Sequence, residues 1–149
     1  MSLWEQLFGH RLDMRHHGHL AGAGAYATHV EIEFGFQDAL EAIVGGRTED
    51  GANFECTAFL VPERREDEEL AVVAVHISGY TVGYLNHEDG ERYRGFLASA
   101  DLVGVASCDA IIIGGWRRED GDGYFQVCLD LAWPLRLQEE LPVEALPEG

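Results

Sequence analysis

The feature that most constrains the fold is a pair of short β-branched segments, 72–77 and 80–85, separated only by Ser78 and Gly79. A two-residue connection that contains glycine, between two such runs, is typical of a β-hairpin because tight hairpin turns require positive φ angles. We therefore predict an antiparallel hairpin over residues 72–85. One consistent register must bury its apolar face. The side chains that should share this face are Val73, Val75 and Ile77.

The rest of the chain also consists mainly of short segments with strand patterns, and few segments have a helical pattern. We expect strands over 29–34, 54–61, 105–113 and 124–131, and helices over 37–44 and 87–98. So many short strands do not suit a doubly wound sheet. The pattern predicts a mainly β (α+β) fold, a small, partly closed OB-like antiparallel barrel of about six strands with two helices.

A chain of 149 residues has the length of one domain. We expect a flexible leader over residues 1–28, which holds four of the seven histidines, and a folded domain over 29–133. Residues 134–149 combine proline with glutamate and indicate an irregular acidic tail. The charged stretch 63–69 is expected to be a short solvated loop.

The charge balance restricts the choice of partners. The formal net charge is −17, and all ten basic residues are arginines. Such a surface repels polyphosphates at long range, whereas proteins that bind nucleic acids derive much of their affinity from neutralising phosphates. The composition therefore argues against strong binding of nucleic acid and allows a basic protein partner.

The cysteines and the apolar runs indicate the compartment. Cys56, Cys108 and Cys128 are widely spaced, form no C-x-x-C pair and lie within apolar strand signals, so we expect reduced thiols in the core. No apolar run reaches the length of a membrane span, and no cleavable signal is visible. We expect a cytoplasmic protein that does not enter a membrane.

No motif points to catalysis, to a cofactor or to a metal. Histidines 10, 16, 17 and 19 lack carboxylate or cysteine partners at ligand spacing. The acidic, glycine-bent stretch 119–123 lacks a full calcium-loop pattern and is expected to be a hairpin turn. The small-residue run 22–24 is not followed by the lysine of a phosphate-binding loop. We therefore predict a protein that is not an enzyme.

The order of several short motifs resembles the HIRAN domain family, in particular small bacterial HIRAN-like proteins. These motifs are F-Q-D-A-L at 36–40, F-L-V-P-E at 59–63, V-G-Y-L at 82–85, G-G-W at 114–116 and L-D-L at 129–131. HIRAN domains occur in DNA-repair and helicase proteins. The resemblance implies a HIRAN-type barrel over about two thirds of the chain, and a pocket for the 3′ end of a single DNA strand.

The resemblance also implies the residues of that pocket. The family's asparagine-proline-tyrosine-aspartate turn falls on residues 66–72, where Glu68 replaces the tyrosine and Glu69 keeps a carboxylate. His87 stands where a basic residue meets phosphate, and Phe125 stands where an aromatic residue stacks. The candidate ligand-binding residues are Phe34, Phe36, Glu69, Tyr84, His87 and Phe125.

Each of these residues also has an ordinary role, in the core for the aromatic residues and on the surface for His87. Two functions therefore stay open. The first is a HIRAN-like module for single-stranded DNA ends, weakened by its acidified turn. The alternative is a protein–protein interaction domain that docks a basic partner and does not bind nucleic acid. The identity of the partner and the oligomeric state are left open by the sequence.

Overall fold

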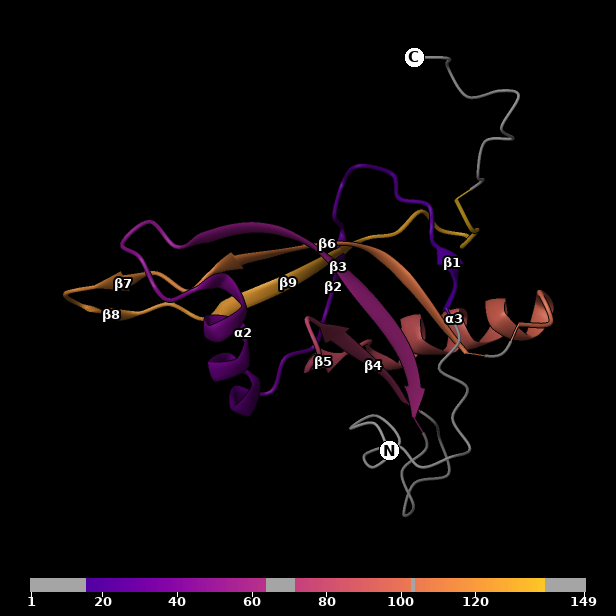
Figure 1. The fold of residues 1–149 in the computed structure, drawn as a ribbon, viewed down its shortest axis with the longest axis horizontal. Helices are drawn as coiled ribbons and strands as arrows, with labels where there is room; N and C mark the ends of the chain where they lie inside the picture. Colours follow the sequence, from indigo (N-terminus) through magenta and orange to yellow (C-terminus); the bar gives the residue numbers. More distant parts are fainter. Residues whose placement is uncertain (1–15, 64–71, 103, 139–149) are drawn as a thin grey trace.

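The structure is a computed structural model that describes residues 16–63, 72–102 and 104–138 (Figure 1). Its strands are β1 (His16–His19), β2 (Thr28–His29), β3 (Ala52–Glu63), β4 (Val72–Ile77), β5 (Tyr80–Tyr84), β6 (Val105–Gly114), β7 (Arg117–Arg118), β8 (Gly121–Asp122) and β9 (Phe125–Asp130). Its helices are the short 3-10 helix η1 (Phe34–Phe36) and the α-helices α2 (Gln37–Val44) and α3 (His87–Ser99).

The main sheet has the strand order β2-β9-β6-β3-β4-β5, and every neighbouring pair in it is antiparallel. The strand β1 adds to the first part of β6 in a parallel direction. The hairpin of β7 and β8 forms a separate arm at the left end of the molecule in Figure 1. The fold class is as predicted: mainly β, with a small curled antiparallel sheet and two α-helices in the described part of the chain.

The hairpin that the sequence predicted is formed by β4 and β5. Ile77 pairs with Tyr80 across a turn in which both central residues have positive φ, 52° at Ser78 and 84° at Gly79. Positive φ at both central residues is typical of a type I′ turn, whose twist matches that of the paired strands. The three side chains expected on the buried face, at positions 73, 75 and 77, are almost completely buried. The predicted hairpin is confirmed.

In the described chain one residue pair, Glu31 and Tyr84, joins the segment after β2 to β5 at the other end of the sheet. The Val30 N–H donates to the Val127 carbonyl of β9 at 3.0 Å, and one residue later the chain turns to β5. There Glu31 and Tyr84 exchange two backbone hydrogen bonds, of 2.8 and 2.9 Å. A Cβ on Gly83 would lie 2.5 Å from the Glu31 carbonyl oxygen. Glycine in the V-G-Y-L motif thus permits the close approach that completes the barrel.

Asn86 is the N-cap of the helix α3. Its side-chain oxygen accepts a hydrogen bond from the Asp89 N–H at 2.8 Å. This helix contributes a fully buried tyrosine, Tyr93, to the core. The Tyr93 hydroxyl accepts from the Ala106 N–H at 3.0 Å and donates to the Leu60 carbonyl at 2.8 Å. It therefore bridges the last pair of β3 and β6, where the two strands begin to separate. Burial raises the pKa of Tyr93 to about 12.

The second half of the expected leader belongs to the folded body. Leu20, next to β1, is 1% exposed, and Thr28 in β2 accepts a hydrogen bond from the Trp133 indole. The glycine-rich run between them wraps around Asp130, whose carboxylate accepts from the N–H groups of Ala23 and Gly24. A chain that provides a strand and buried side chains is not a free leader. Residues 1–15 lie outside the described residues.

Two further boundaries differ from those expected. Leu137 in the expected tail pairs with Leu20, so the body continues to residue 138, and residues 139–149 lie outside the described part. The strand β3 continues through Pro62 to Glu63. Proline is tolerated there because β6 pairs with β3 only as far as Leu60, which leaves that edge open. The rest of the expected charged loop, 64–69, is likewise outside the described residues. None of the described helices is long and apolar enough to cross a membrane.

We predict that Gly83→Ala destabilises the protein by about 2 kcal/mol, because the added methyl group overpacks the contact with Glu31. Urea unfolding followed by tryptophan fluorescence measures the change. Gly95→Ala is the matched control, since the same methyl group would meet open space on the exposed face of α3. The control should gain about 0.5–1 kcal/mol from helix propensity. Equal effects at both positions would contradict the role of Gly83.

The buried His76 predicts a dependence of stability on pH. Desolvation lowers its pKa to about 4, and its neighbours are the Thr81 hydroxyl at 3.3 Å and the Glu63 carboxylate at 4.0 Å. An unfolded histidine binds a proton near pH 6.5, so the unfolded state takes up the proton first as the pH falls. The stabilisation by neutral His76 is therefore complete above pH 6.5 and is lost towards pH 4.

The loss should reach about 1.4 kcal/mol per pH unit at its steepest. Other groups titrate over the same range, so the measurement compares wild type with His76→Gln in unfolding curves at several pH values. The variant should show a shallower fall in the free energy of unfolding below pH 6.5. Parallel pH profiles would mean that His76 does not carry the effect.

Candidate ligand-binding groove

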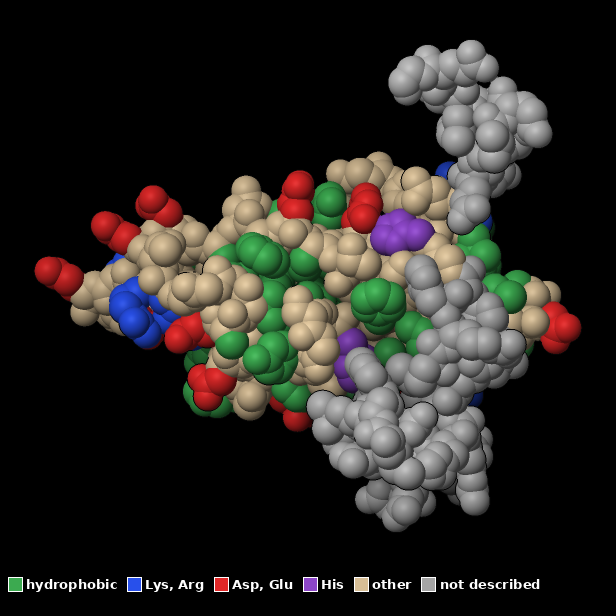
Figure 2. Space-filling model, viewed as in Figure 1, with side chains coloured by type: hydrophobic (Ala, Val, Ile, Leu, Met, Phe, Trp, Pro, Cys, Tyr) green, Lys and Arg blue, Asp and Glu red, His purple; other side chains and the backbone are tan. Residues whose placement is uncertain are grey.

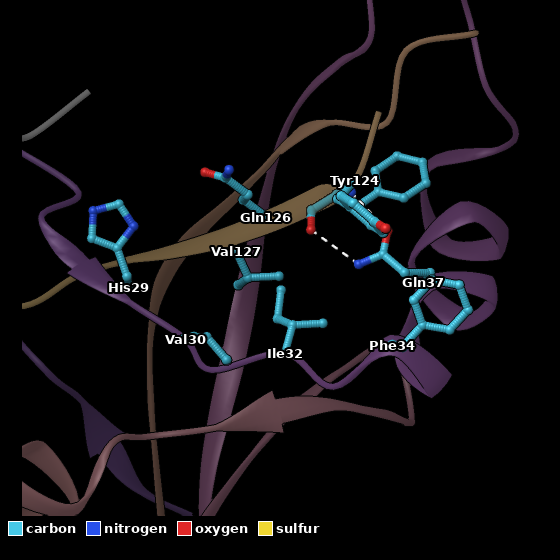
Figure 3. Close-up of a pocket in the computed structure, with 9 residues that line it drawn as sticks. His29, Val30, Ile32, Phe34, Gln37, Tyr124, Gln126 and Val127 are labelled. Atoms are coloured by element: carbon cyan, nitrogen blue, oxygen red, sulfur yellow. Dashed lines mark hydrogen bonds between the residues drawn. The ribbon is translucent and has the colours of Figure 1, made fainter. Parts of the chain in front are cut away.

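An open groove of about 530 Å³ lies where the chain leaves β9 to reach β5 (Figure 3). It exists because residues 30–31 change partners there, so the strands on either side diverge. Figure 3 shows apolar side chains along its middle, His29 and Gln126 towards one end, and Phe34, Gln37 and Tyr124 towards the other. The lining residues are His29, Val30, Ile32, Phe34, Gln37, Tyr124, Phe125, Gln126 and Val127.

The side chain of Gln37 takes the place of a missing strand at one wall of the groove. Its amide NH₂ donates to the Phe125 carbonyl at 3.1 Å, and its amide oxygen accepts from the Phe125 N–H at 2.7 Å. These are the backbone groups that a continued β2 would have bonded. The edge of β9 is therefore closed at this point, and a ligand in the groove must be held mainly by side chains.

Two exposed aromatic rings stand at the end of the groove. Phe34 in η1 is 78% exposed and Tyr124, just before β9, is 63% exposed. Their ring centroids are 6.0 Å apart with an interplanar angle of 72°, an edge-to-face contact. Large apolar rings so exposed cost hydration free energy unless a ligand covers them. Together they offer aromatic faces on which a planar or cationic group could stack.

The structure brings together only some of the site residues expected from the sequence. Phe34 lines the groove, while Phe36 is half-buried and packs against Tyr84 with ring centroids 6.0 Å apart. His87 does not line the groove: it starts α3, is exposed, and lies 3.2 Å from the Glu91 carboxylate. Glu69 lies outside the described residues.

Phe125 takes the core role that the sequence analysis had set beside ligand binding. The residue is 2% exposed, and the Arg47 guanidinium lies 4.7 Å from the centre of its ring. A side chain on Gly115 would overlap the same ring. The Phe125 ring is thus enclosed in the core and offers no free face for stacking. The strand register instead exposes its neighbour, Tyr124.

The G-G-W motif has a packing explanation. Gly114 has φ of 82°, and Gly115 makes room for the ring of Phe125. The Trp116 ring lies on Gly123, where any side chain would overlap the indole. These glycines allow close packing at the base of the arm of β7 and β8, against Phe125 and Trp116. The motif thus secures one end of the groove and is not itself a ligand-binding loop.

The lining residues that sequence reasoning did not name include His29, Gln37, Tyr124 and Gln126. For Tyr124 a signal was present, since side chains alternate along a strand and its neighbour Phe125 is apolar and bulky. If Phe125 faces the core, Tyr124 must face outward. For Gln37 no local signal exists, because its two hydrogen bonds join residues far apart in the sequence.

No arginine of residues 16–63, 72–102 and 104–138 lines the groove, and Arg47 and Arg117, which lie towards its β9 end, are engaged elsewhere. Arg47 pairs with Glu41 at 2.6 Å and donates to the Gly123 carbonyl at 2.7 Å. Figure 2 shows the blue Lys and Arg side chains of one face gathered near the β7–β8 end and flanked by red carboxylates. Arg117 there lies 3.4 Å from Asp122. The site is therefore aromatic and uncharged, within an acidic surface.

One cluster resembles a catalytic triad by residue type. His19 bonds to the Ser107 hydroxyl at 2.8 Å through Nδ1 and to the Asp109 carboxylate at 2.9 Å through Nε2. The serine, however, is the buried member, at 2% exposure, while Asp109 is exposed. A substrate could not reach the hydroxyl in this arrangement. The cluster ties β1 to β6 and gives no indication of catalysis.

The cysteines behave as expected for core thiols. Burial raises the pKa of Cys108 to about 12 and that of the half-buried Cys56 to about 11. Cys128 is buried, with its sulfur 3.6 Å from His29 Nδ1. Within residues 16–63, 72–102 and 104–138, no group of histidine, cysteine and acidic side chains could hold a metal ion.

The chain matches no protein-family model, no curated protein and no solved structure. Any function must therefore be inferred from its own residues and from the motifs given above.

We predict that Gln37→Leu destabilises the protein by about 2 kcal/mol or more, because it leaves the Phe125 N–H and carbonyl without their partners. Urea unfolding gives the free energy, and hydrogen exchange of the Phe125 amide should become faster. Gln126→Leu removes the same amide from an exposed position and should change stability by less than about 0.5 kcal/mol. Unchanged exchange at Phe125 in Gln37→Leu would show that the amide does not close this edge.

Proposed function

We propose that this chain is a HIRAN-like binding module, not an enzyme, and that its ligand site is the groove at the junction of β2, η1 and β9. The observation that carries the proposal is the exposed pair Phe34 and Tyr124 at the end of that groove. A HIRAN-type barrel is compatible with the mainly β fold and gives a physical role to V-G-Y-L. A cytoplasmic location is part of the same proposal.

The resemblance makes single-stranded DNA ends the first ligand to consider. Modules that bind single strands combine aromatic platforms with positive charge along the backbone path. Here exposed aromatic rings are present, but none of the described arginines lines the groove. With a net charge of −17, affinity for DNA should be weak.

The second candidate ligand is a basic segment of a partner protein. The observation that favours it is the charge around the groove: Glu31, Glu33 and Asp38 are exposed and adjoin lining residues. Carboxylates placed in this way attract a cationic partner and repel phosphates. A basic partner would thus bind in the same groove as DNA, but the surrounding carboxylates would attract it, whereas they repel DNA.

We predict that fluorescently labelled single-stranded DNA with a free 3′-hydroxyl binds with micromolar affinity at best near physiological salt, with a shallow salt dependence. Phe34→Ala should weaken the residual binding further, because it removes a stacking face. Tyr80→Ala, at an exposed aromatic residue on the β4–β5 hairpin, is the control and should have no effect. Fluorescence anisotropy measures both.

Nanomolar binding by the wild type would show that local positive charge outweighs the acidic surface. Equal loss in the two variants would place the DNA contact away from the groove.

A further inference from the structure

This protein repeatedly covers its aromatic rings with arginine. Among the described residues three guanidinium groups lie over aromatic rings, at 4.7, 5.1 and 5.4 Å from the ring centres. The pairs are Arg47 with Phe125, Arg118 with Trp116, and Arg92 with Trp133. A cation over an aromatic face is attracted by the negative face of the ring. The most exposed rings of the described chain, Phe34 and Tyr124, have no such partner among the described arginines.

Two exposed carboxylates that adjoin lining residues in the sequence are also free to take a cation. Glu31 and Glu33 precede the lining residues Ile32 and Phe34, and both are exposed. Neither forms an ion pair with another described residue, whereas Arg47, Arg92 and Arg117 all have carboxylate neighbours. Unpaired negative charge therefore adjoins, along the chain, the segment that carries the bare Phe34 ring.

The closed edge of β9 limits how a partner can bind. Gln37 already bonds to the Phe125 N–H and carbonyl, so a peptide cannot simply extend the sheet at that position. Recognition must come from side chains that reach the rings. The chemistry that satisfies both an aromatic face and a carboxylate is a guanidinium group, which stacks through its plane and donates through its edge.

We propose that the groove binds an arginine-bearing segment of a partner protein, with the guanidinium lying on the exposed faces of Phe34 and Tyr124 and donating to Glu31 or Glu33. This inference rests on the groove being the ligand site, as proposed above. It specifies which residue type the partner must present and which two chemical features of the groove recognise it. The arginine supplied by the partner completes the pattern that the protein uses internally three times.

The test uses the full chain and a labelled short peptide in which arginine alternates with leucine and serine. A second peptide carries citrulline, the neutral isostere, at each arginine position. We expect the arginine peptide to bind and the citrulline peptide to bind at least about tenfold more weakly, since a cation–π contact and an ion pair together reach that size. Phe34→Ala and the double variant Glu31→Gln/Glu33→Gln should each weaken arginine-peptide binding several-fold.

The matched control is Glu119→Gln/Asp120→Asn, which removes two exposed carboxylates at the turn between β7 and β8. It has the same change in net charge and should leave the affinity within about twofold of wild type, since charges beyond a Debye length are screened. An equal loss of arginine-peptide affinity in both double variants would mean that only the net charge of the protein matters, and this would overturn the proposal. Equal binding of the arginine and citrulline peptides would overturn it as well.

The side-chain amide signals of Gln37 and Gln126 in NMR spectra separate failure of this inference from failure of the proposed function. If single-stranded DNA shifts these signals but the arginine peptide does not, the groove is a ligand site with a different occupant. If neither probe shifts them, the groove is not the ligand site, and both proposals fall. We expect the arginine peptide to shift Gln126 at lower concentration than DNA does.

Discussion

The two hydrogen bonds between Glu31 and Tyr84 hold together the two ends of an otherwise open sheet. Because the chain leaves β9 at Val30 to make them, the same step that closes the barrel opens the groove beside it. The glycine at position 83 belongs to this closure, since any side chain there would hold the two backbones apart. The architecture and the candidate site thus depend on one local exchange of partners, and a change in the closure should alter both.

The sequence predicted the fold class well because its strongest signals are local. The β4–β5 hairpin follows from two apolar runs and a Ser-Gly turn, all within fourteen residues of chain. The boundaries of the folded domain were harder to predict, since β1 pairs with β6 and Leu137 pairs with Leu20, far away in the sequence. The run of small residues near position 22 looked like a linker, yet it wraps the carboxylate of Asp130. Low local complexity did not distinguish a linker from a loop packed against a buried acid.

The candidate residues occupy different places in the fold. Phe34 lies exposed in the lining of the groove, whereas the ring of Phe125 is buried beneath Arg47 and beside Gly115. A motif identifies which residues sit near a site, but the strand register decides which of two neighbours faces it. At the start of β9 that register turns Phe125 inward and Tyr124 outward. Gln37 could not be found from the sequence, because its side chain bonds to the Phe125 backbone where β2 has already ended. That arrangement exists only in the folded chain.

The balance between aromatic surface and charge is the remaining constraint on function. Exposed rings favour stacking with either a base or a guanidinium group, so aromatic character alone does not choose between them. Charge distinguishes the two ligands, because a nucleic-acid base is attached to negatively charged phosphates whereas a guanidinium group is itself positively charged. Three of the described arginines are instead engaged within the fold: Arg47 joins α2, the arm and the ring of Phe125, and Arg92 and Arg117 pair with carboxylates. An acidic barrel whose groove is lined by no described arginine is better suited to receive a cation than to attract a polyanion.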